Sequence, residues 1–219
     1  MASTTVAAAL PVEAVVFDFG GVLISPITEK LELLAARHNT TMHALLALLL
    51  GPRESGDHPW HRCERGEIAV ADIQEMLQPW AEIAEIRLHG DEIAMLLTAD
   101  YRIVDEMVAK VGELRTAGVR TALLTNTFSE FRPTMQRDLD FALFHAVVES
   151  FAVGARKPEP AIYAATSDAL GVADDRIVYL DDFDQNLVPA QALGWRTVHV
   201  TSPAQALAEL ARLVAAGAS

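Results

Sequence analysis

Hydrophobic residues follow two different patterns along this chain, and the two patterns occupy different regions. Short runs of β-branched and aromatic residues, typical of buried strands, occur once near the N-terminus and repeatedly after residue 100. Between residues 25 and 99 no strand-like run is found, and hydrophobic residues follow the spacing of helices instead. The pattern therefore predicts an α/β unit into which an all-helical segment is inserted.

In the second half of the chain, predicted strands alternate with predicted helices. Together with the first, strands are expected at 12–18, 119–124, 146–148, 176–180 and 196–200. Helices are expected at 101–117, 159–170 and 185–193, and after Pro203. Strands that alternate with helices form parallel sheets covered on both faces. The expected fold class is therefore α/β, with a Rossmann-like doubly wound parallel sheet.

The inserted segment is predicted to form an all-helical domain of its own. Its helices are expected at 28–38, 41–50, 70–80 and 91–97. Thr41 and Asp91 are suitable N-cap residues, and Gly51-Pro52 is a helix stop. The polar and aromatic connector 53–66 is expected to be a loop. We therefore expect a discontinuous core domain of residues 1–24 and 100–219, and a cap domain of residues 25–99.

Polar and charged residues follow the predicted strands at their carboxyl ends. They are Asp18, Thr125, Asn126, Asp181 and Asp182, and Lys157 stands in a loop just ahead of a helix. In a parallel sheet these positions converge on one edge. Three carboxylates would repel one another there unless a hard cation such as Mg²⁺ held them together. A lysine with hydroxyl and amide donors would bind an oxyanion beside the metal, and phosphate fits best.

The charge and the cysteine content of the chain exclude some classes of binding partner and indicate its cellular compartment. The formal net charge of −13 makes nucleic acid and anionic membranes unsuitable partners. The lone Cys63 excludes an internal disulfide and fits a reducing compartment. No basic stretch and apolar run of signal-peptide type precede Pro11, and the longest apolar run, 44–50, is too short to cross a bilayer. We therefore expect a cytoplasmic protein, either monomer or homodimer.

At this point the residues resemble a known family, the haloacid dehalogenase superfamily of hydrolases. The four matching motifs are Phe17-Asp18-Phe19-Gly20-Gly21-Val22, Leu124-Thr125-Asn126, Lys157-Pro158 and Leu180-Asp181-Asp182. The resemblance is to the subclass with a helical cap inserted after the first motif. Residues 121–200 look like the N-terminal phosphatase domain of soluble epoxide hydrolases. Residues 64–68 are similar to bacterial sugar-phosphate phosphatases of the superfamily.

The resemblance implies a role for each motif residue. Asp18 would attack phosphorus and form an aspartyl-phosphate intermediate. Mg²⁺ would be held by the Asp18 carboxylate, the Gly20 carbonyl and Asp182. Asp181 would act through a metal-bound water or from a position outside the direct ligands. Phosphate oxygens would be bound by Thr125, Gly21 and the backbone of Asn126. Lys157 would offset the negative charges of the nucleophile and the phosphate.

One position departs from the family pattern. Most phosphatases of the superfamily carry a second Asp two residues after the nucleophile, as general acid and base, and this chain has Gly20 there. General acid–base catalysis typically contributes roughly 10²–10⁴-fold to the rate. Substrates whose leaving groups need little protonation, such as anomeric, acyl or aryl phosphates, would lose least.

Three functions stay open on the sequence alone. The leading hypothesis is a Mg²⁺-dependent phosphatase on a small phosphorylated metabolite, sugar phosphate-like, with the cap setting specificity. A second is a dehalogenase that uses Asp18 on carbon, although dehalogenases of the superfamily do not need the Asp181-Asp182 pair. The third is a catalytically weakened protein that binds a phosphorylated ligand, since Gly20 replaces the usual acid.

Several residues also have a purely structural interpretation. Asp181 could cap a turn, and Asn186 could shape the turn after the fourth motif or contact ligand. The connector residues His58, His61 and Arg62 are expected in a solvated loop more than in a site. Trp60 is expected in a hydrophobic core, and Cys63 as a small packing residue.

Overall fold

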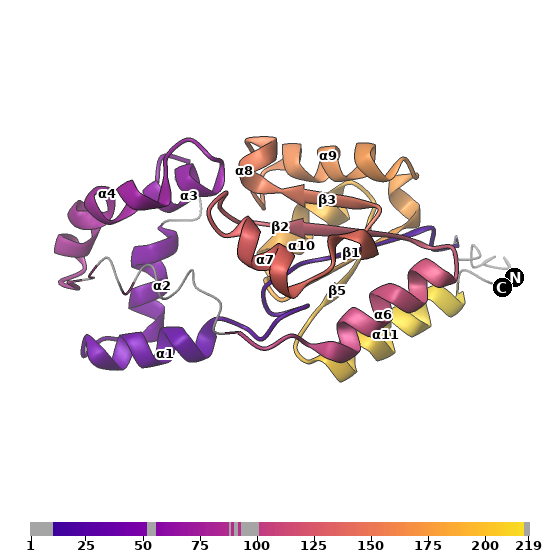
Figure 1. The fold of residues 1–219 in the computed structure, drawn as a ribbon, viewed down its shortest axis with the longest axis horizontal. Coiled ribbons are helices and arrows are strands. Elements are labelled where there is room, and N and C mark those ends of the chain that lie inside the picture. The colour runs from indigo at the N-terminus through magenta and orange to yellow at the C-terminus, as the bar shows by residue number, and fades with distance from the viewer. Residues whose placement is uncertain (1–10, 52–55, 88, 90–91, 93–100, 217–219) are drawn as a thin grey trace, which may run out of the picture.

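The computed structural model describes residues 11–51, 56–87, 89, 92 and 101–216. Within these residues the centre of the molecule is a five-stranded parallel sheet in the order β3-β2-β1-β4-β5 (Figure 1). The strands are β1 Ala14–Phe17, β2 Arg120–Thr125, β3 Ala146–Glu149, β4 Ile177–Asp181 and β5 Arg196–His199. The predicted fold class, a Rossmann-like α/β sheet with helices on both faces, is confirmed.

Helices cover both faces of the sheet because alternate residues of each strand point to opposite sides. The flanking helices are α6 Asp105–Thr116, α7 Arg132–Asp138, α8 Ser150–Val153, α9 Pro160–Leu170, α10 Asp184–Ala192 and α11 Pro203–Ala216. On β1, Val15 and Phe17 belong to the core shared with α6 and α11. Ala14 and Val16 belong to the core shared with α9 and α10. Burial on both faces explains why β1 is hydrophobic without alternation.

Strand register determines which residues meet at the carboxyl edge of the sheet. Phe17 of β1 pairs with Leu123 on one side and Leu180 on the other. The residues that follow these three positions therefore lie at the same level of the sheet. From β1 the chain passes to β2 and then β3 on one side, and it then crosses over to β4 and β5 on the other side of β1. Ligands of such sheets bind in the crevice beside the point where the strand order reverses.

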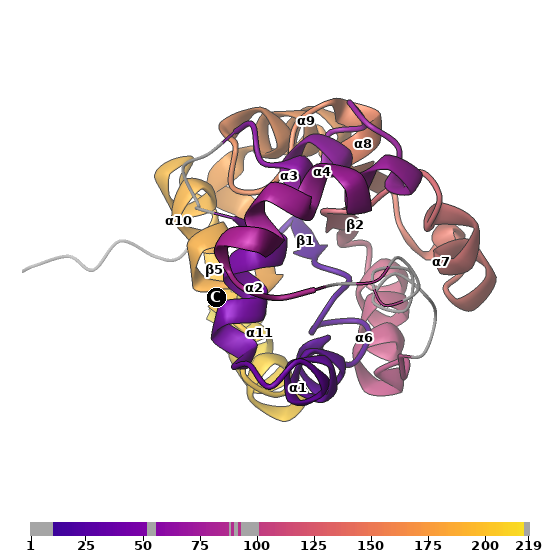
Figure 2. The same cartoon turned by 90° about the vertical axis from the view of Figure 1, so that its left-hand side faces the viewer.

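The helices α1 Thr28–Arg37, α2 Met42–Leu50, α3 Pro59–Glu64 and α4 Val70–Ile83 form a separate cluster. They pack around a hydrophobic core of their own that contains Leu34, Leu45, Ile73 and Leu77. Figures 1 and 2 show this cluster, hereafter the cap, in front of the carboxyl ends of the strands. An antiparallel contact between Ile24 and Ile103 lies near the predicted boundaries of the insertion. The boundaries themselves, at residues 24 and 100, stay a prediction.

Several predicted elements differ from those observed. The connector 53–66 is not all loop, because α3 begins at Pro59, where the fixed φ of proline suits the first helical position. The helix α4 continues beyond Trp80 to Ile83 with Pro79 inside it. The helix α6 begins at Asp105, not at 101, and α7 was not predicted. The predicted helix 91–97 lies outside the described residues, apart from Glu92.

Within the described part of the chain, no helix has both the length and the apolar character needed to cross a bilayer. Cys63 is buried in the cap core, so its predicted packing role is confirmed. Burial raises the pKa of its thiol to about 12. The thiol is therefore protonated at neutral pH, and its side chain acts as a small hydrophobic group.

Candidate active site

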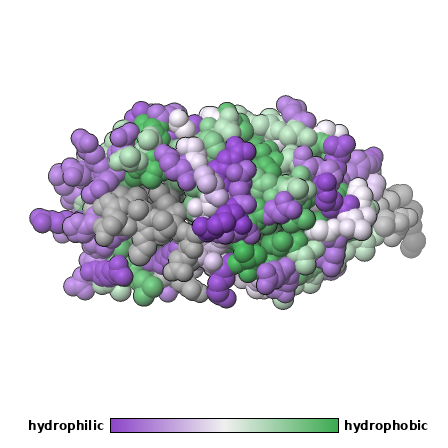
Figure 3. Space-filling view, in the orientation of Figure 1, coloured by the Kyte–Doolittle hydropathy of each residue, from purple (hydrophilic) through white to green (hydrophobic). Residues whose placement is uncertain are grey.

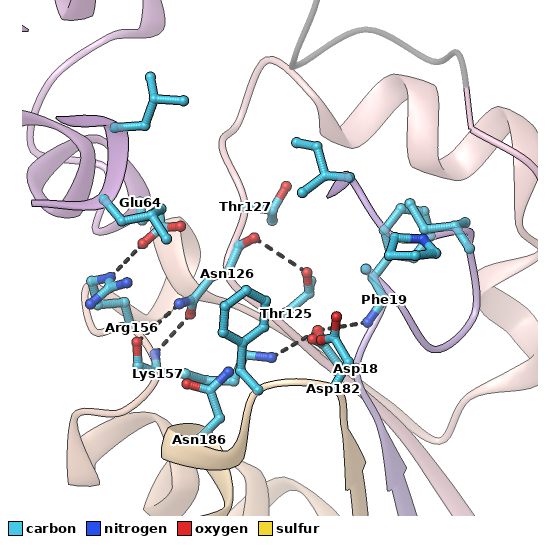
Figure 4. A pocket seen from close by; sticks show the side chains of 18 of the residues that line it. Asp18, Phe19, Glu64, Thr125, Asn126, Thr127, Arg156, Lys157, Asp182 and Asn186 are labelled. Carbon is cyan, nitrogen blue, oxygen red and sulfur yellow. Dashed lines mark hydrogen bonds and ion pairs between the residues drawn. The ribbon is translucent and has the colours of Figure 1, made fainter. Parts of the chain in front are cut away.

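The structure brings the predicted site residues together around one cavity of about 270 Å³ between the strand ends and the cap (Figure 4). Those that line it are Asp18, Gly20, Gly21, Thr125, Asn126, Lys157 and Asp182. Asp181 is fully buried directly beside them. The positions follow from the register of β1, β2 and β4, whose carboxyl ends supply most of this set.

Three carboxylates are crowded together at the floor of the cavity. Oxygen atoms of Asp18, Asp181 and Asp182 all lie within 4.8 Å of one another. Burial, opposed by Lys157 but reinforced by the two neighbouring acids, raises the pKa of Asp18 well above its usual value. Burial and repulsion from Asp181 raise the pKa of Asp182 to about 7. Lys157 alone therefore does not balance the three carboxylates, and a bound cation would stabilise their ionised form.

Lys157 is the cation that the protein itself brings to this cluster. Its Nζ lies 2.8 Å from Asp18 Oδ1 and 2.7 Å from Asp181 Oδ2, and the side chain is only 2% exposed. Burial disfavours the ammonium form, but attraction to the two carboxylates outweighs it and raises the pKa of Lys157. The lysine is therefore charged and fixed between the two acids.

Asp181 is held by several donors besides Lys157. Its carboxylate accepts hydrogen bonds from the Tyr179 hydroxyl, from Phe183 N at 2.8 Å and from Asn186 Nδ2 at 3.1 Å. With its oxygens so engaged, Asp181 is better placed to orient Lys157 than to face the cavity. Asn186 donates to Asp181 and also lines the cavity, so it stabilises the turn after the fourth motif, and its contact with ligand stays a prediction.

The site has the donor set that a hard divalent cation requires. Asp182 Oδ1 is buried and has no hydrogen-bond partner among the described residues, which is costly unless a cation or water satisfies it. The Asp18 carboxylate lies within reach of the same point. Carboxylate oxygens of this kind suit Mg²⁺. The residues present therefore fit the metal that the sequence predicted.

The two glycines that follow Asp18 differ in backbone conformation and in the space around them. Gly21 has a φ of +68°, and a Cβ there would lie 2.1 Å from Asp182 Oδ2. Glycine at 21 therefore lets the turn after β1 approach Asp182 closely. A Cβ at Gly20 would meet nothing within 4 Å, and its backbone is not in the left-handed region. Position 20 therefore has space for a side chain.

The Asn126 side chain contacts the protein backbone instead of pointing free into the cavity. Its Nδ2 donates to the Lys157 carbonyl at 3.0 Å, and its Oδ1 accepts from Lys157 N at 2.7 Å. These two bonds hold the loop that carries Lys157 against the end of β2. The Asn126 backbone and the buried Thr125 hydroxyl stay the predicted phosphate contacts at this edge.

The cap supplies the opposite wall of the cavity. Its contributions are mainly apolar, from α1, α2, α3 and the segment before α1: Ile27, Leu31, Leu46, Leu49, Leu50 and Trp60. The Trp60 ring packs edge-on against Phe128 at 5.1 Å between centroids. Trp60 is buried in the cap core as predicted, and its indole also lines the cavity.

A buried ion pair between Glu64 and Arg156 connects this wall to the core, and the sequence analysis did not assign a role to either residue. Glu64 also accepts from Trp60 Nε1 at 2.9 Å. A second pair joins Arg65 Nη1 to Glu159 Oε1 at 3.0 Å. Helix α3 and the residue after it are therefore fixed to the loop that contains Lys157. The available signal was the clustering of charges at 64–65 and 156–159.

The prediction that His58 and His61 lie in a solvated loop was wrong. His58 is fully buried and packs against Trp80 at 4.8 Å between ring centroids, and His61 is 3% exposed. Burial lowers the pKa of His58 to about 4, so it is neutral. Arg62 is partly exposed and pairs with Glu67, as a solvated residue would. None of these three is among the described residues that line the cavity.

A family model for haloacid dehalogenase-like hydrolases matches residues 12–194 of the chain. Acyl-CoA dehydrogenase family member 10 of Mus musculus is 32% identical over 205 residues, 92% of this chain and 19% of that protein. The chain thus spans about a fifth of that relative's length. Sesquiterpene phosphatase astK of Aspergillus oryzae is 26% identical over 208 residues, 92% of this chain and 96% of that protein.

A solved structure shares the fold. It is a haloacid dehalogenase family enzyme of Bacteroides thetaiotaomicron in complex with magnesium and inorganic phosphate, with a TM-score of 0.61 at 19% identity. The match covers 85% of this chain and 93% of that chain. At this identity the likeness concerns the fold alone.

The different surroundings of the two glycines lead to a test by alanine. Gly21→Ala should lower the free energy of unfolding by about 1–2 kcal/mol through the positive φ alone. The loss should be larger because the new Cβ also forces Asp182 to move. Gly20→Ala should change it by less than about 0.5 kcal/mol. Urea unfolding of both variants measures the difference. Equal losses would show that Gly21 does not control the approach of Asp182.

Proposed function

This chain belongs to the haloacid dehalogenase-like hydrolases, and we propose that it is a Mg²⁺-dependent phosphatase acting on a small phosphorylated metabolite. The observation that carries the proposal is the buried cluster of Asp18, Asp181 and Asp182, with Lys157 between two of them. The relative named a phosphatase, which the chain covers almost completely, supports the same reaction. The neighbour solved with magnesium and phosphate supports the metal.

Asp18 is the residue that we assign as nucleophile. Its Oδ1 accepts from Phe19 N at 2.7 Å and from Lys157 Nζ, so the carboxylate has a fixed orientation. The other oxygen would attack phosphorus, and the bond between phosphorus and the alcohol oxygen would break. Water would then attack the phosphorus of the aspartyl-phosphate, releasing inorganic phosphate and restoring the carboxylate.

The remaining residues bind and balance charge. Lys157 reduces the repulsion between the Asp18 carboxylate and the incoming phosphate. Thr125 and the backbone amides near Gly21 and Asn126 would donate to phosphate oxygens. Asp18, Asp182 and the Gly20 carbonyl would hold Mg²⁺, and Asp181 would lie outside these direct ligands. When bound, the metal supplies positive charge between the two anions.

The acid cluster also separates phosphate hydrolysis from dehalogenation. A halide leaves without a proton or a metal, so a dehalogenase has no need for the crowded pair Asp181 and Asp182. Their crowding, and the unpartnered Asp182 Oδ1, favour a reaction that uses a cation. The third hypothesis, a ligand-binding protein without turnover, depends on Gly20 alone, and the tests below address it.

Metal dependence is the first test. Turnover of 4-nitrophenyl phosphate should vanish after chelation and return with Mg²⁺. Asp182→Asn should raise the Mg²⁺ concentration needed for half-maximal rate by at least about tenfold, since even residues outside the direct ligands cost that much. Asp184→Asn is the matched control, because Asp184 is exposed on the same segment. Undiminished turnover after exhaustive chelation would contradict the proposal.

The covalent step is the second test. Asp18→Asn keeps the shape of the side chain but removes the attacking charge, so activity should fall to background while thermal unfolding still shows a folded protein. Acid quenching of the wild type during turnover should trap one phosphoryl group on the peptide that contains Asp18, detectable by mass spectrometry. A panel of haloacids is the parallel assay. Release of halide without phosphatase activity would replace the proposal with dehalogenation.

Gly20 gives the third test. An Asp at this position has space for its Cβ and ordinary backbone geometry, so Gly20→Asp should fold. It should increase kcat/KM up to about 10²-fold for alkyl phosphates, whose leaving groups need a proton, and little for aryl phosphates. The measurement is a plot of log kcat/KM against leaving-group pKa for both proteins. Equal, shallow slopes would mean that the missing acid does not restrict this enzyme.

A further inference from the structure

The cavity is polar at one end and apolar at the other. The charged residues Asp18, Lys157 and Asp182 lie at the sheet, where the phosphate would be bound. The wall on the cap side is mostly hydrocarbon, and its residues are Ile27, Leu31, Leu46, Leu49, Leu50 and Trp60. Aromatic residues of the core also line the cavity. A ligand that fits both ends has a phosphate and an apolar group.

Helix α2 is apolar on two sides, for two different reasons. Leu45 and Leu48 are buried in the cap core. Leu46 and Leu50, one turn apart, are only partly buried and line the cavity. A surface helix normally has a polar face opposite its core face. Leu46 and Leu50 pack in part against the cap core, and the part of this second apolar face that the core leaves uncovered lines the cavity.

Other apolar side chains are also left uncovered at the cavity. Ile27 and Phe183 are each 38% exposed, and both line it. In contrast, the outer edge of the cap is mainly hydrophilic in the view of Figure 3. Apolar surface exposed to water is unfavourable, and a ligand that covers it would be stabilised by its burial.

The polar groups that Glu64 and Tyr101 contribute to the cavity walls already have partners, whereas Gln185 Oε1, on the core side of the lining, is buried without one among the described residues. The Glu64 carboxylate accepts from Trp60 and pairs with Arg156. The Tyr101 hydroxyl donates to Asp138 Oδ2 at 2.9 Å. Lys30 is a further polar residue of this lining. A sugar carries a hydroxyl on nearly every carbon, and burying those hydroxyls against hydrocarbon without partners is strongly unfavourable.

We propose that the substrate is a phosphate monoester of an apolar alcohol or phenol, whose hydrocarbon part lies against Leu46, Leu50 and Ile27. The volume of about 270 Å³ lies near the lower end of the roughly 300–1,000 Å³ of small-molecule sites, which suits a small apolar group. This inference rests on the proposed phosphatase function. It replaces the sugar-like leaving group that the sequence resemblance suggested.

A series of para-substituted phenyl phosphates tests the proposal with the leaving-group pKa held nearly constant. From phenyl to 4-methyl-, 4-ethyl- and 4-propylphenyl phosphate, kcat/KM should rise about three- to fourfold per carbon until the cavity is full. The diol 4-(2,3-dihydroxypropyl)phenyl phosphate has the same carbon skeleton as the propyl compound. It should be at least about tenfold poorer. A flat series, or a preference for the diol, overturns the proposal.

Variants of the apolar wall connect this preference to named residues. Leu46→Gln and Leu50→Gln should each reduce the ratio of kcat/KM for the propyl compound over the diol by about tenfold. Both leucines are partly exposed and pack only at the edge of the cap core, so thermal unfolding of each variant is measured beside its kinetics. Leu33→Gln is the matched control, because Leu33 is 65% exposed on α1 and is not among the described lining residues. An equal effect of Leu33→Gln overturns the assignment.

Binding without turnover separates failure of this proposal from failure of the proposed function. Calorimetry with Mg²⁺ compares propylphosphonate with 2,3-dihydroxypropylphosphonate, neither of which can be hydrolysed at the carbon–phosphorus bond. Tighter binding of propylphosphonate supports an apolar site even if no phosphate ester is turned over. Equal or reversed affinities, together with normal phosphatase activity, overturn the apolar substrate and leave the phosphatase intact.

Discussion

The buried ion pairs of Lys157 with Asp18 and Asp181 are the interaction on which the rest of the site depends. Charges removed from water are tolerated only when they are paired and hydrogen-bonded, and the surroundings of Lys157 meet that condition. Asn126 holds its backbone, while Tyr179, Phe183 and Asn186 saturate Asp181. The remaining negative charge, on Asp18 and Asp182, is left facing the cavity. The site is thus built to receive positive charge and, beside it, an anion.

The carboxyl edge of the sheet could be predicted because it follows from local patterns. Hydrophobic runs identify the strands, and parallel pairing then brings Asp18 and Asp181 to one level, with Thr125 one residue farther along β2, whatever the helices do. The space beside Gly20 and the lack of it beside Gly21 could not be predicted. The difference lies in how closely Asp182 approaches, and Asp182 is more than 150 residues away along the chain.

The cap was predicted less completely, since its residues acquire their roles from tertiary packing. The polar residues of the connector, such as His58, indicated a solvated loop. In the structure His58 packs against Trp80 and is fully buried, just before the buried helix α3. The pairing of Glu64 with Arg156 joins residues 92 positions apart. The Leu-rich sequence of α2 indicates a buried helix, but not that one of its faces lines a cavity.

The ion pairs of the cap have a consequence for how such a protein can diverge. They tie α3, and the residue after it, to the loop that carries Lys157. Four residues of the apolar wall, in contrast, come from α1 and α2: Leu31, Leu46, Leu49 and Leu50. These two helices contribute no charge to the two ion pairs between the cap and that loop. Substitutions in these two helices can therefore reshape what the cavity accepts while the charged floor keeps its geometry. In the proposed phosphatase, substrate range and chemistry would therefore be encoded in separable segments, and selection could change one without rebuilding the other.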